Sequence, residues 1–559
     1  MRLHTRLRYA PAEIRIEKRA DGTQVLRSPQ PLGSHARAVG DWLVHWYERA
    51  PERTFLAERK GDGWRRVSYR DALSDARRIG QALLNLGLDA SRPVAILSDN
   101  SVEHALLALG AMHVGVPVAP ISPAYSLMSK DFAKLKSIFE LLRPGLVFAA
   151  EPEKFAGALA AVGATSTPVA RLLETNPGST LEVAFSRLKP ETVAKILFTS
   201  GSTGAPKGVS FSHRQIVLHT LAVLGAISSA AHGQSFRHGD VYMPMTPLFH
   251  VHAWGNPYLA TLLGVKQVYP GRYVPEQLLA LRAREGVTYS HCVPTILQML
   301  LSAADKTGAD LRGWKICIGG SALPVGLARD ALRRGIDVFA GYGMSETGPV
   351  LAISRLLEPA GSLPEDAELE RRCRTGLPVP LVDLRLGDAG SADVPRDGRS
   401  VGEILVRAPW TTMAYVGDAE ASEALWRGGY LHTQDVALID AQGYLQITDR
   451  IKDVIKTGGE WLSSLELESL ISQHPGVAEV AVIATPDARW GERPHAVVVP
   501  RADWRDRLGV ADIQEHVAAA AASGTVPRFA VPERVTLVDE LAKTSVGKIN
   551  KRVLRERYG

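Results

Sequence analysis

Thr199-Ser-Gly-Ser-Thr-Gly-Ala-Pro-Lys-Gly208 is the stretch that decides how this chain of 559 residues is interpreted. It follows an apolar, strand-like run at 194–198 and precedes a helical pattern that begins at Ser212. Glycines let the backbone turn so that several N–H groups point at one phosphate. Hydroxyl and ammonium donors are added by Ser200, Ser202, Thr203 and Lys207. The stretch therefore predicts a phosphate-binding loop.

The same loop could in principle be a P-loop or a linker. Its spacing, G-S-T-G-x-P-K-G, differs from the G-x-x-x-x-G-K-[ST] pattern, so the P-loop fold is not indicated. A glycine- and serine-rich stretch is also typical of solvated linkers. The strand before it and the fixed lysine favour the phosphate site over the linker.

Helix and strand patterns alternate on both sides of the loop. Upstream, helical patterns at 69–86 and 129–142 alternate with strand patterns at 93–97, 116–121 and 146–149, and Asn100 with Glu103 predicts a helix N-terminus. Downstream, strands are predicted at 266–269, 287–291, 315–318 and 338–340, with helices at 275–285, 295–306 and 324–334. This βαβ order predicts an α/β fold with parallel sheets covered by helices.

The last third of the chain has a different pattern. Residues 376–449 show short strands with glycine turns and no helical pattern, which predicts a small β-subdomain. Helices at 463–473 and 510–522, strands at 479–484 and 495–500 and a final basic helix then predict a compact α+β unit. Because single cores stop growing at roughly 250–300 residues, we expect two domains, 1–450 and 451–559, with a boundary at 450–452.

Composition narrows the functional class. The chain is 45% hydrophobic and 22% charged, and its net charge of +6 is spread along it, unlike that of a nucleic-acid binder. Cys292, Cys317 and Cys373 lie far apart, which disfavours disulfides or a zinc site; the first two lie in apolar runs and are expected in the core. No signal-peptide run or bilayer-spanning stretch is present, so we expect a cytoplasmic protein without stable membrane insertion.

Four further motifs follow the loop in order: Gly341-Tyr-Gly-Met-Ser-Glu-Thr347, His432-Thr-Gln-Asp435, Asp449-Arg-Ile-Lys-Asp-Val-Ile-Lys456 and Thr544-Ser-Val-Gly-Lys548. With the loop they resemble the signatures of the adenylate-forming (AMP-binding) superfamily of acyl-CoA synthetases, peptide-synthetase adenylation domains and luciferases, over nearly the whole chain. The resemblance implies a large N-terminal domain of parallel βαβ subdomains plus a β-subdomain, followed by a mobile α+β lid.

The resemblance also implies roles for individual residues. Lys548, His250, Glu346 and Lys207 would be catalytic, and Thr203 and Glu346 would bind Mg²⁺. Nucleotide or cofactor contacts would be made by Thr199, Ser200, Gly201, Ser202, Thr203, Gly204, Gly320, Gly341, Tyr342, Gly343, Ser345, Asp435, Arg450, Lys452, Lys456 and Trp461.

Chemistry agrees with several of these roles, although each residue also has a plain structural interpretation. Tyr342 offers a flat face to a purine, and Glu346 offers the hard oxygen that Mg²⁺ prefers. Asp435 is equally typical of a turn, Glu346 of a helix start and Lys548 of a solvated basic tail. The chain carries Gln434 where relatives usually have glycine, which puts the local turn in question.

The implied reaction is an AMP-forming ligation. A carboxylic acid attacks the α-phosphate of ATP with Mg²⁺ and Lys548 in place, pyrophosphate leaves, and a thiol, that of coenzyme A, attacks the acyl-AMP. The small domain would rotate about Lys452 between the two steps. The implied partners are small molecules: an acid, ATP and CoA. A homodimer is left open.

Two parts of the chain indicate different acids. Arg27-Ser-Pro-Gln-Pro-Leu-Gly33 and Pro120-Ile-Ser-Pro-Ala-Tyr-Ser126 look like bacterial feruloyl-CoA synthetases. Leu248-Phe-His-Val-His-Ala-Trp254, Gly319-Gly-Ser-Ala-Leu-Pro324 and Lys456-Thr-Gly-Gly-Glu-Trp-Leu-Ser-Ser464 look like medium- and long-chain fatty-acyl-CoA synthetases. The chain thus resembles a mosaic, natural or constructed.

The second set decides the prediction, because in the family that part builds the acyl pocket. It implies substrate contacts at His250, Trp254 and Gly319, with Trp254 gating an acyl tunnel or, alternatively, packing in the core. We expect a medium- or long-chain fatty acid, with a hydroxycinnamate as the alternative. The motifs are also compatible with an adenylation enzyme serving another thiol, a luciferase-like enzyme or a nucleotide sensor without activity.

Overall fold

The computed structural model describes residues 13–18, 22, 24–27, 29, 35–61, 63–199, 206–228, 234–358, 362–388, 390–450, 453–457, 460–543 and 549–559. Two large sheets dominate this part of the chain. The first has the order β7-β5-β6-β8-β9, with β5 (Val94–Leu97), β6 (Val118–Ile121), β7 (Leu146–Ala149), β8 (Val193–Thr199) and β9 (Lys207–Ser212). Neighbouring strands are parallel except β8 and β9. The predicted βαβ order is confirmed.

The second sheet has nine strands and draws on two distant parts of the chain. Its order is β16-β15-β14-β13-β12-β10-β11-β3-β4. These strands are β3 (Thr54–Lys60), β4 (Gly63–Ser68), β10 (Val241–Pro244), β11 (Lys266–Tyr269), β12 (Tyr289–Cys292), β13 (Lys315–Ile318), β14 (Asp337–Gly343), β15 (Val350–Ile353) and β16 (Leu377–Pro378). The early hairpin β3–β4 joins at β11, where Leu56 lies opposite Gln267.

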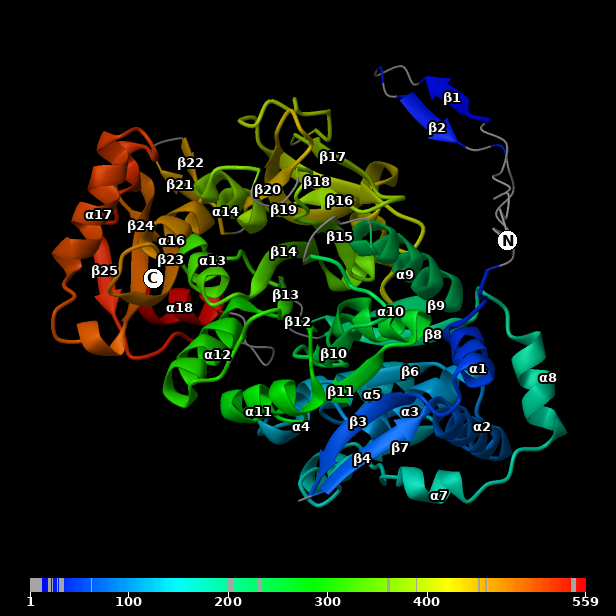
Figure 1. The fold of residues 1–559 in the computed structure, drawn as a ribbon. Helices are drawn as coiled ribbons and strands as arrows, with labels where there is room; N and C mark the ends of the chain where they lie inside the picture. The colour runs from blue at the N-terminus through cyan, green and yellow to red at the C-terminus, as the bar shows by residue number, and fades with distance from the viewer. Residues whose placement is uncertain are drawn as a thin grey trace, which may run out of the picture.

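Helices separate and cover the two sheets (Figure 1). One face of the nine-stranded sheet carries α11 (Pro275–Glu285), α12 (Pro294–Thr307), α13 (Val325–Arg333) and α14 (Glu365–Cys373). The space between the sheets holds α1 (Val39–Arg49), α2 (Tyr69–Asn85), α3 (Val102–His113), α9 (His213–Ser228) and α10 (Asn256–Leu263). The outer face of the five-stranded sheet carries α5 (Ala133–Leu142) and α6 (Ala156–Ala161). Because both faces are covered, β5, β6 and β7 are buried throughout.

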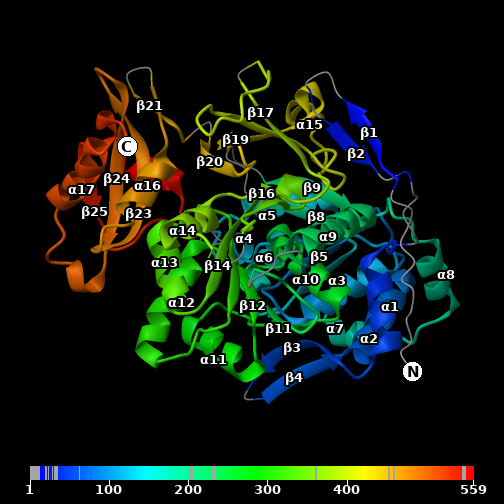
Figure 2. The same cartoon turned by 45° about the horizontal axis from the view of Figure 1, so that its top comes forward.

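A β-subdomain and a C-terminal unit complete the chain. The subdomain is an antiparallel sheet of β17 (Asp383–Gly387), β18 (Gly402–Arg407), β19 (Leu431–Ile439) and β20 (Leu445–Arg450). The C-terminal unit contains β21 (Ile455–Thr457), β22 (Glu460–Leu462), α16 (Ser464–Ile471), β23 (Val477–Asp487), β24 (Gly491–Pro500), α17 (Val510–Ala522), β25 (Arg534–Leu537) and α18 (Lys551–Tyr558). Figure 2 shows it beside the β-subdomain.

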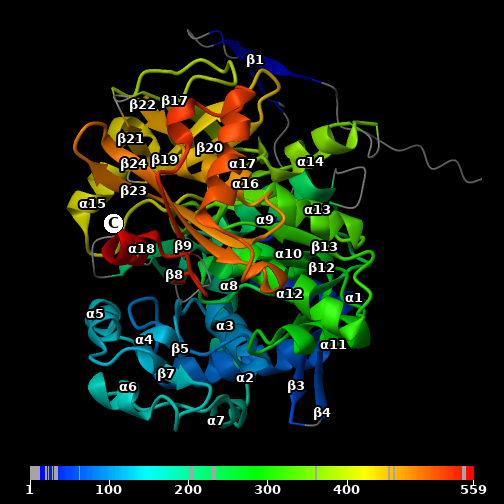
Figure 3. The ribbon, with the colours of Figure 1, turned by 90° about the vertical axis from the view of Figure 1, so that its left-hand side faces the viewer.

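Contacts join the C-terminal unit to α13, one of the helices that cover the nine-stranded sheet. A Cβ built on Gly326 in α13 would lie 3.0 Å from the carbonyl oxygen of Ser472, so the two backbones touch. An ion pair of 3.9 Å joins Arg501 and Asp330. Figure 3 shows α16 and α17 on this side of the molecule.

The smaller elements lie at the periphery. They are β1 (Arg15–Lys18), β2 (Gln24–Arg27), α4 (Ala124–Leu127), α7 (Val169–Leu173), α8 (Ser179–Arg187) and α15 (Ala419–Leu425). Strands β1 and β2 form a hairpin outside the large sheets (Figure 1). Cys292 and Cys317 are buried, as predicted. Among the described helices, none is long and apolar enough to cross a bilayer.

Two local predictions are wrong. Helix α3 is capped by Ser101, whose hydroxyl accepts from the His104 N–H, whereas the Asn100 amide bonds to the segment 244–248. The range 376–449 also contains a helix, α15, capped by Asp418. Seven residues are too few to show helical periodicity in a sequence, so this helix gave no signal.

Candidate active site

The predicted phosphate loop joins two strands of the five-stranded sheet. Thr199 ends β8, Lys207 begins β9, and the two residues are paired in the antiparallel ladder. Ser200, Gly201, Ser202, Thr203 and Gly204 lie outside the described residues. The hairpin therefore fixes where the loop starts and ends, and it places Lys207 at its base.

Lys207, Tyr415 and Glu346 form the first cluster of the site. The Lys207 Nζ lies 4.7 Å from the centre of the Tyr415 ring and 3.7 Å from Oδ2 of Asp418. The Tyr415 hydroxyl donates a hydrogen bond of 2.7 Å to Oε1 of Glu346. Sequence reasoning missed Tyr415, because it lies 69 residues from Glu346 and in none of the motifs.

Glu346 carries a buried carboxylate. Only 7% of the residue is exposed, and burial raises the pKa of its carboxyl above the ordinary value, although the Tyr415 hydrogen bond opposes this shift. Among the described residues no hydrogen bond uses its other oxygen, Oε2.

Tyr342, Asp435 and Arg450 form the second cluster. The Tyr342 hydroxyl donates to Oδ2 of Asp435 at 2.8 Å, and Nε of Arg450 donates to Oδ1 at 3.1 Å. Asp435 and Arg450 lie directly opposite each other in β19 and β20. Each carboxylate oxygen keeps a second lone pair, so Asp435 can also accept from a hydroxyl pair such as that of a ribose. Tyr342 near the end of β14 and Glu346 in the turn that follows are four residues apart, so the two clusters are neighbours.

A bulge in β19 aims Asp435 at this site. The pairing of β18 and β19 shifts between Glu403 and Leu405, and Gln434 takes a left-handed backbone with φ of 60°. Glycine adopts such a φ without strain, whereas Gln434 needs its neighbours to hold this conformation. Oε1 of Glu403 accepts from the Gln434 N–H at 2.9 Å, and its Oε2 lies 2.9 Å from Nδ1 of His432. Glu403 thus holds the unusual turn.

The GYG motif needs glycine because of close packing. A Cβ built on Gly343 would lie 1.9 Å from the carbonyl oxygen of Pro349, so a side chain does not fit. Gly341 and Tyr342 pair with β15, and Ser345 begins a short 3₁₀ turn that carries Glu346. This packing brings Tyr342 and Glu346 to the carboxyl end of β14, where ligands of parallel sheets bind.

The predicted acyl residues lie on a strained turn beside this edge. Half-buried His250 precedes Val251–Gly255, where five consecutive residues have φ between 47° and 76°. The Trp254 ring packs against His291 in a tilted arrangement, with ring centres 4.8 Å apart and an angle of 41° between the ring planes. A Cβ on Gly319 would lie 2.9 Å from the Trp254 ring, so the indole packs directly on this backbone. Gly320, the next residue after Gly319, is exposed.

The structure does not bring Lys456 to these clusters, and other predicted residues lie wholly or partly outside the described part of the chain. Lys456 is exposed in β21, and its backbone N–H donates to Glu492 within the C-terminal unit. The backbone of Trp461 pairs with Lys456, while its side chain lies outside the described part of the chain. Lys452 and Lys548 are also outside the described residues. Their roles stay predictions.

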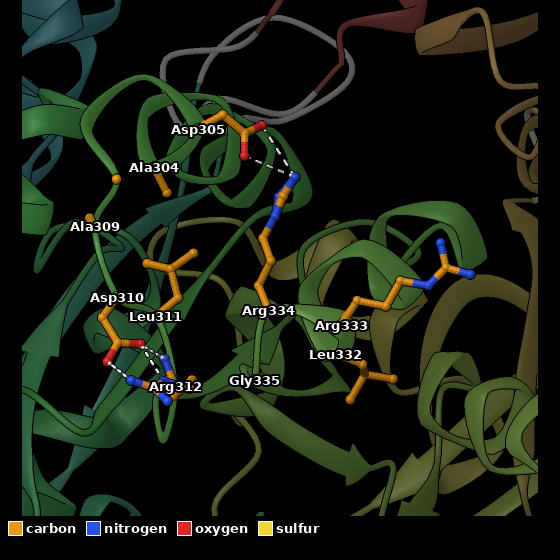
Figure 4. A pocket seen from close by; sticks show the side chains of 11 residues that line it. Ala304, Asp305, Ala309, Asp310, Leu311, Arg312, Leu332, Arg333, Arg334 and Gly335 are labelled. Atoms are coloured by element: carbon orange, nitrogen blue, oxygen red, sulfur yellow. Dashed lines mark hydrogen bonds and ion pairs between the residues drawn. The ribbon is translucent and has the colours of Figure 1, made fainter.

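A surface cavity of about 610 Å³ lies elsewhere (Figure 4). It is lined by residues just before β13 and β14, among them Asp305, Asp310, Arg312 and Arg334. Arg312 pairs with Asp310 and Arg334 with Asp305. This cavity therefore lies at the amino ends of the strands, opposite the edge that carries Tyr342 and Glu346.

The donor set fits magnesium better than a transition metal. The described part of the chain contains no group of three or more His, Cys, Asp or Glu that could hold a metal. Mg²⁺ usually takes one or two carboxylates and completes its shell with water and substrate phosphates. A single buried carboxylate, Glu346, near a phosphate loop meets that requirement.

Comparison with known proteins gives the same answer as the geometry. The family model of AMP-binding enzymes matches residues 43–416, and the model of the AMP-binding enzyme C-terminal domain matches residues 466–548. The chain belongs to the AMP-binding enzyme family. The predictions of the fold class and of an ATP-dependent, AMP-forming ligase of the acyl-CoA synthetase class are thereby confirmed.

Individual relatives show the range of this family. A long-chain-fatty-acid–CoA ligase of Thermus thermophilus is 36% identical over 517 residues, covering 88% of this chain and 90% of that protein. A feruloyl-CoA synthase of an Amycolatopsis species is 30% identical and covers 94% of this chain and 99% of its own. The solved structure of an anthranilate CoA ligase in complex with anthranoyl-AMP shares the fold, with a TM-score of 0.79 at 22% identity, covering 93% of this chain and 97% of that one.

Proposed function

We propose that this chain activates a fatty acid of medium or longer chain as an acyl-adenylate and transfers the acyl group to coenzyme A. The observation that carries the proposal is that two clusters, Glu346–Tyr415–Lys207 and Tyr342–Asp435–Arg450, lie side by side near the carboxyl end of β14. One cluster offers ligands for a metal and phosphates, and the other offers an aromatic face and ribose acceptors.

The residues divide the first half-reaction between them. Asp435 and Arg450 hold the ribose, and Tyr342 packs on the adenine. Glu346 and Thr203 would hold Mg²⁺, which would offset negative charge on the triphosphate. Lys207 and Lys548 supply further positive charge, Lys548 between the acid and the α-phosphate. Fixed charges of this kind stabilise the transition state without moving during the reaction.

Two observations support a fatty acid. The Thermus thermophilus relative, named for long-chain fatty acids, is the more similar of the two ligases compared above. Trp254 belongs to a cluster of buried apolar and aromatic side chains that includes Tyr242, Tyr289 and Phe339. The feruloyl-CoA synthase similarity over 94% of the chain keeps a hydroxycinnamate as the second candidate.

An acid panel tests the proposal. Octanoate, palmitate and ferulate are each assayed for CoA-dependent AMP formation, and pyrophosphate release is followed without CoA. We expect octanoate or palmitate to give the highest kcat/KM, with thioester only when CoA is present. A preference for ferulate overturns the fatty-acid assignment. Adenylate without thioester overturns coenzyme A as the acceptor. The homodimer and the cytoplasmic location stay predictions from sequence.

A further inference from the structure

A small internal cavity lies between the two large sheets, apart from the nucleotide residues. Its volume is about 40 Å³, and it is lined by β3, α3, β8, the Leu248–His252 segment, α10 and β11. A single water needs about 10–15 Å³ of such space, so the cavity accommodates an ion of about three heavy atoms. Its polar lining residues are His104, Lys195, His252, Tyr258, Thr261, Gln267 and Tyr269.

Lys195 is a buried cation that the proposed mechanism does not use. It lies in β8 and is 4% exposed. Its Nζ donates two long hydrogen bonds, each 3.4 Å, to the carbonyl of Leu248 and the hydroxyl of Tyr258. Among the described residues no acidic side chain forms an ion pair with it, and burial lowers its pKa to about 7. A buried ammonium without a counter-charge is strongly disfavoured.

His252 supplies a second donor on the same cavity. It is 1% exposed, and its Nδ1 lies 3.5 Å from the Tyr258 hydroxyl. Since that hydroxyl accepts from Lys195, its own hydrogen points to Nδ1 of His252. This assignment leaves the imidazole hydrogen on Nε2. Nε2 is buried and makes no hydrogen bond within the described structure.

We propose that this cavity binds a small monovalent carboxylate-type anion, of the size of formate or bicarbonate, between the Lys195 ammonium and Nε2–H of His252. No acidic residue is among the described residues that line it. The remaining wall is largely apolar, with Phe55, Leu56 and Met112, which disfavours a larger polyanion. An anion supplies both the missing counter-charge and the missing acceptor.

The site lies directly beneath the turn that carries His250 and Trp254. Lys195 holds the carbonyl of Leu248 at one end of that segment and the hydroxyl of Tyr258 beyond its other end. A bound anion therefore keeps Lys195 charged and strengthens both contacts. The proposal does not depend on which acid the enzyme activates.

Thermal unfolding of the full chain in a formate series tests the proposal. At constant ionic strength, the wild-type Tm should rise with the logarithm of the formate concentration once that concentration exceeds Kd. Lys195→Met keeps the length of the side chain and removes its charge, so this formate-dependent rise should vanish. Lys136→Met, at an exposed lysine of α5, is the matched control and should respond like wild type. If Lys195→Met responds to formate as wild type does, the proposal is wrong.

A second variant and two further anions complete the test. His252→Asn suits the left-handed φ of 56° and removes the Nε2 donor, so the formate Kd should rise about tenfold. Bicarbonate should act like formate, and an equal response to chloride overturns the carboxylate assignment. If Lys195→Met does not fold, the NMR line width of ¹³C-formate is compared in the presence of wild type and of His252→Asn. A broader line with wild type supports the site, and equal line widths contradict it. If the wild type responds to none of the anions, the proposal is wrong, and Lys195 is then a neutral lysine in a hydrated cavity.

Discussion

The hydroxyl of Tyr415 and Oε1 of Glu346 are joined by a hydrogen bond of 2.7 Å. This bond fixes the rotamer of the carboxylate and favours its charged form against the effect of burial. A residue far away in the sequence thus offsets part of the rise that burial causes in the pKa of Glu346.

Tyr415→Phe should move the acid limb of the pH–rate profile to higher pH. Loss of the hydrogen bond raises the pKa of Glu346 further, and protons then compete better with Mg²⁺. Profiles of kcat/KM at several Mg²⁺ concentrations measure this shift. In the control Glu346→Gln, turnover and Mg²⁺ affinity should fall while the fold is kept. An unmoved acid limb in Tyr415→Phe contradicts the metal role of Glu346.

The raised pKa of Glu346 also makes the folding stability of the wild-type protein depend on pH. Because the folded-state pKa of Glu346 is raised, its contribution to stability is present below the unfolded-state pKa. That contribution is lost as the pH rises through the folded-state value.

Glu403→Gln should weaken ATP binding, although Glu403 belongs to neither cluster. The carboxylate holds the Gln434 N–H and the His432 ring, and a neutral amide has only one accepting atom. We expect the bulge to relax and the KM for ATP to rise about tenfold, with a smaller change in kcat. Gln434→Gly is the control, since glycine suits φ of 60° and should leave this KM unchanged. An unaltered KM in Glu403→Gln rules out the positioning role.

Trp254→Ala should change the chain-length profile and leave the KM for ATP unchanged. Removing the indole opens space above Gly319, where the acyl chain is proposed to pass. Loss of a purely structural tryptophan would instead cost roughly 3–5 kcal/mol of stability. Acid specificity and Tm are both measured. A fall in Tm with an unchanged acid ranking supports the core interpretation.

Lys548→Ala should abolish acyl-AMP formation and largely spare thioester formation from supplied acyl-AMP. The lysine is proposed to bridge the acid and the α-phosphate only in the adenylating arrangement. Each half-reaction is assayed separately. Equal losses in both indicate a structural role.

Lys452→Pro should give the reverse pattern. Proline fixes φ near −65°, which blocks rotation at the proposed hinge and domain boundary. If the adenylating orientation is the trapped one, acyl-AMP still forms while thioester formation falls by orders of magnitude. Thioester from acid, ATP and CoA at near wild-type rate would place the hinge elsewhere between 449 and 459.

Periodicity predicted the bounds of several helices and strands. The helix at 275–285 and the strands at 146–149, 266–269 and 315–318 have the predicted bounds, because apolar runs there end at glycine or proline. The N-terminus of α3 was predicted one residue too early, because Asn100 and Ser101 are both favourable N-cap residues. In the structure the Asn100 side chain accepts a hydrogen bond from the Leu248 N–H, so Ser101 is the cap.

The site residues also divide into those that the sequence predicted and those that it did not. Glu346, Asp435 and Arg450 lie in local motifs and were found, and the structure brings them together. Tyr415, Glu403 and Lys195 were missed, because their roles depend on contacts across 69, 31 and 53 residues of chain. No local spacing encodes such contacts, since they exist only after the sheets have formed.

The pairing of β3 with β11 has a consequence for synthesis on the ribosome. Leu56 in β3 can pair with Gln267 in β11 only after Gln267 has been synthesised, roughly 210 residues later. At about 5–20 residues per second this delay lasts about 10–40 s. During that interval the five-stranded sheet can already close, while the β3–β4 hairpin keeps an unpaired edge that invites misassociation. The nascent chain therefore has a defined period in which chaperone protection of its first 70 residues matters most.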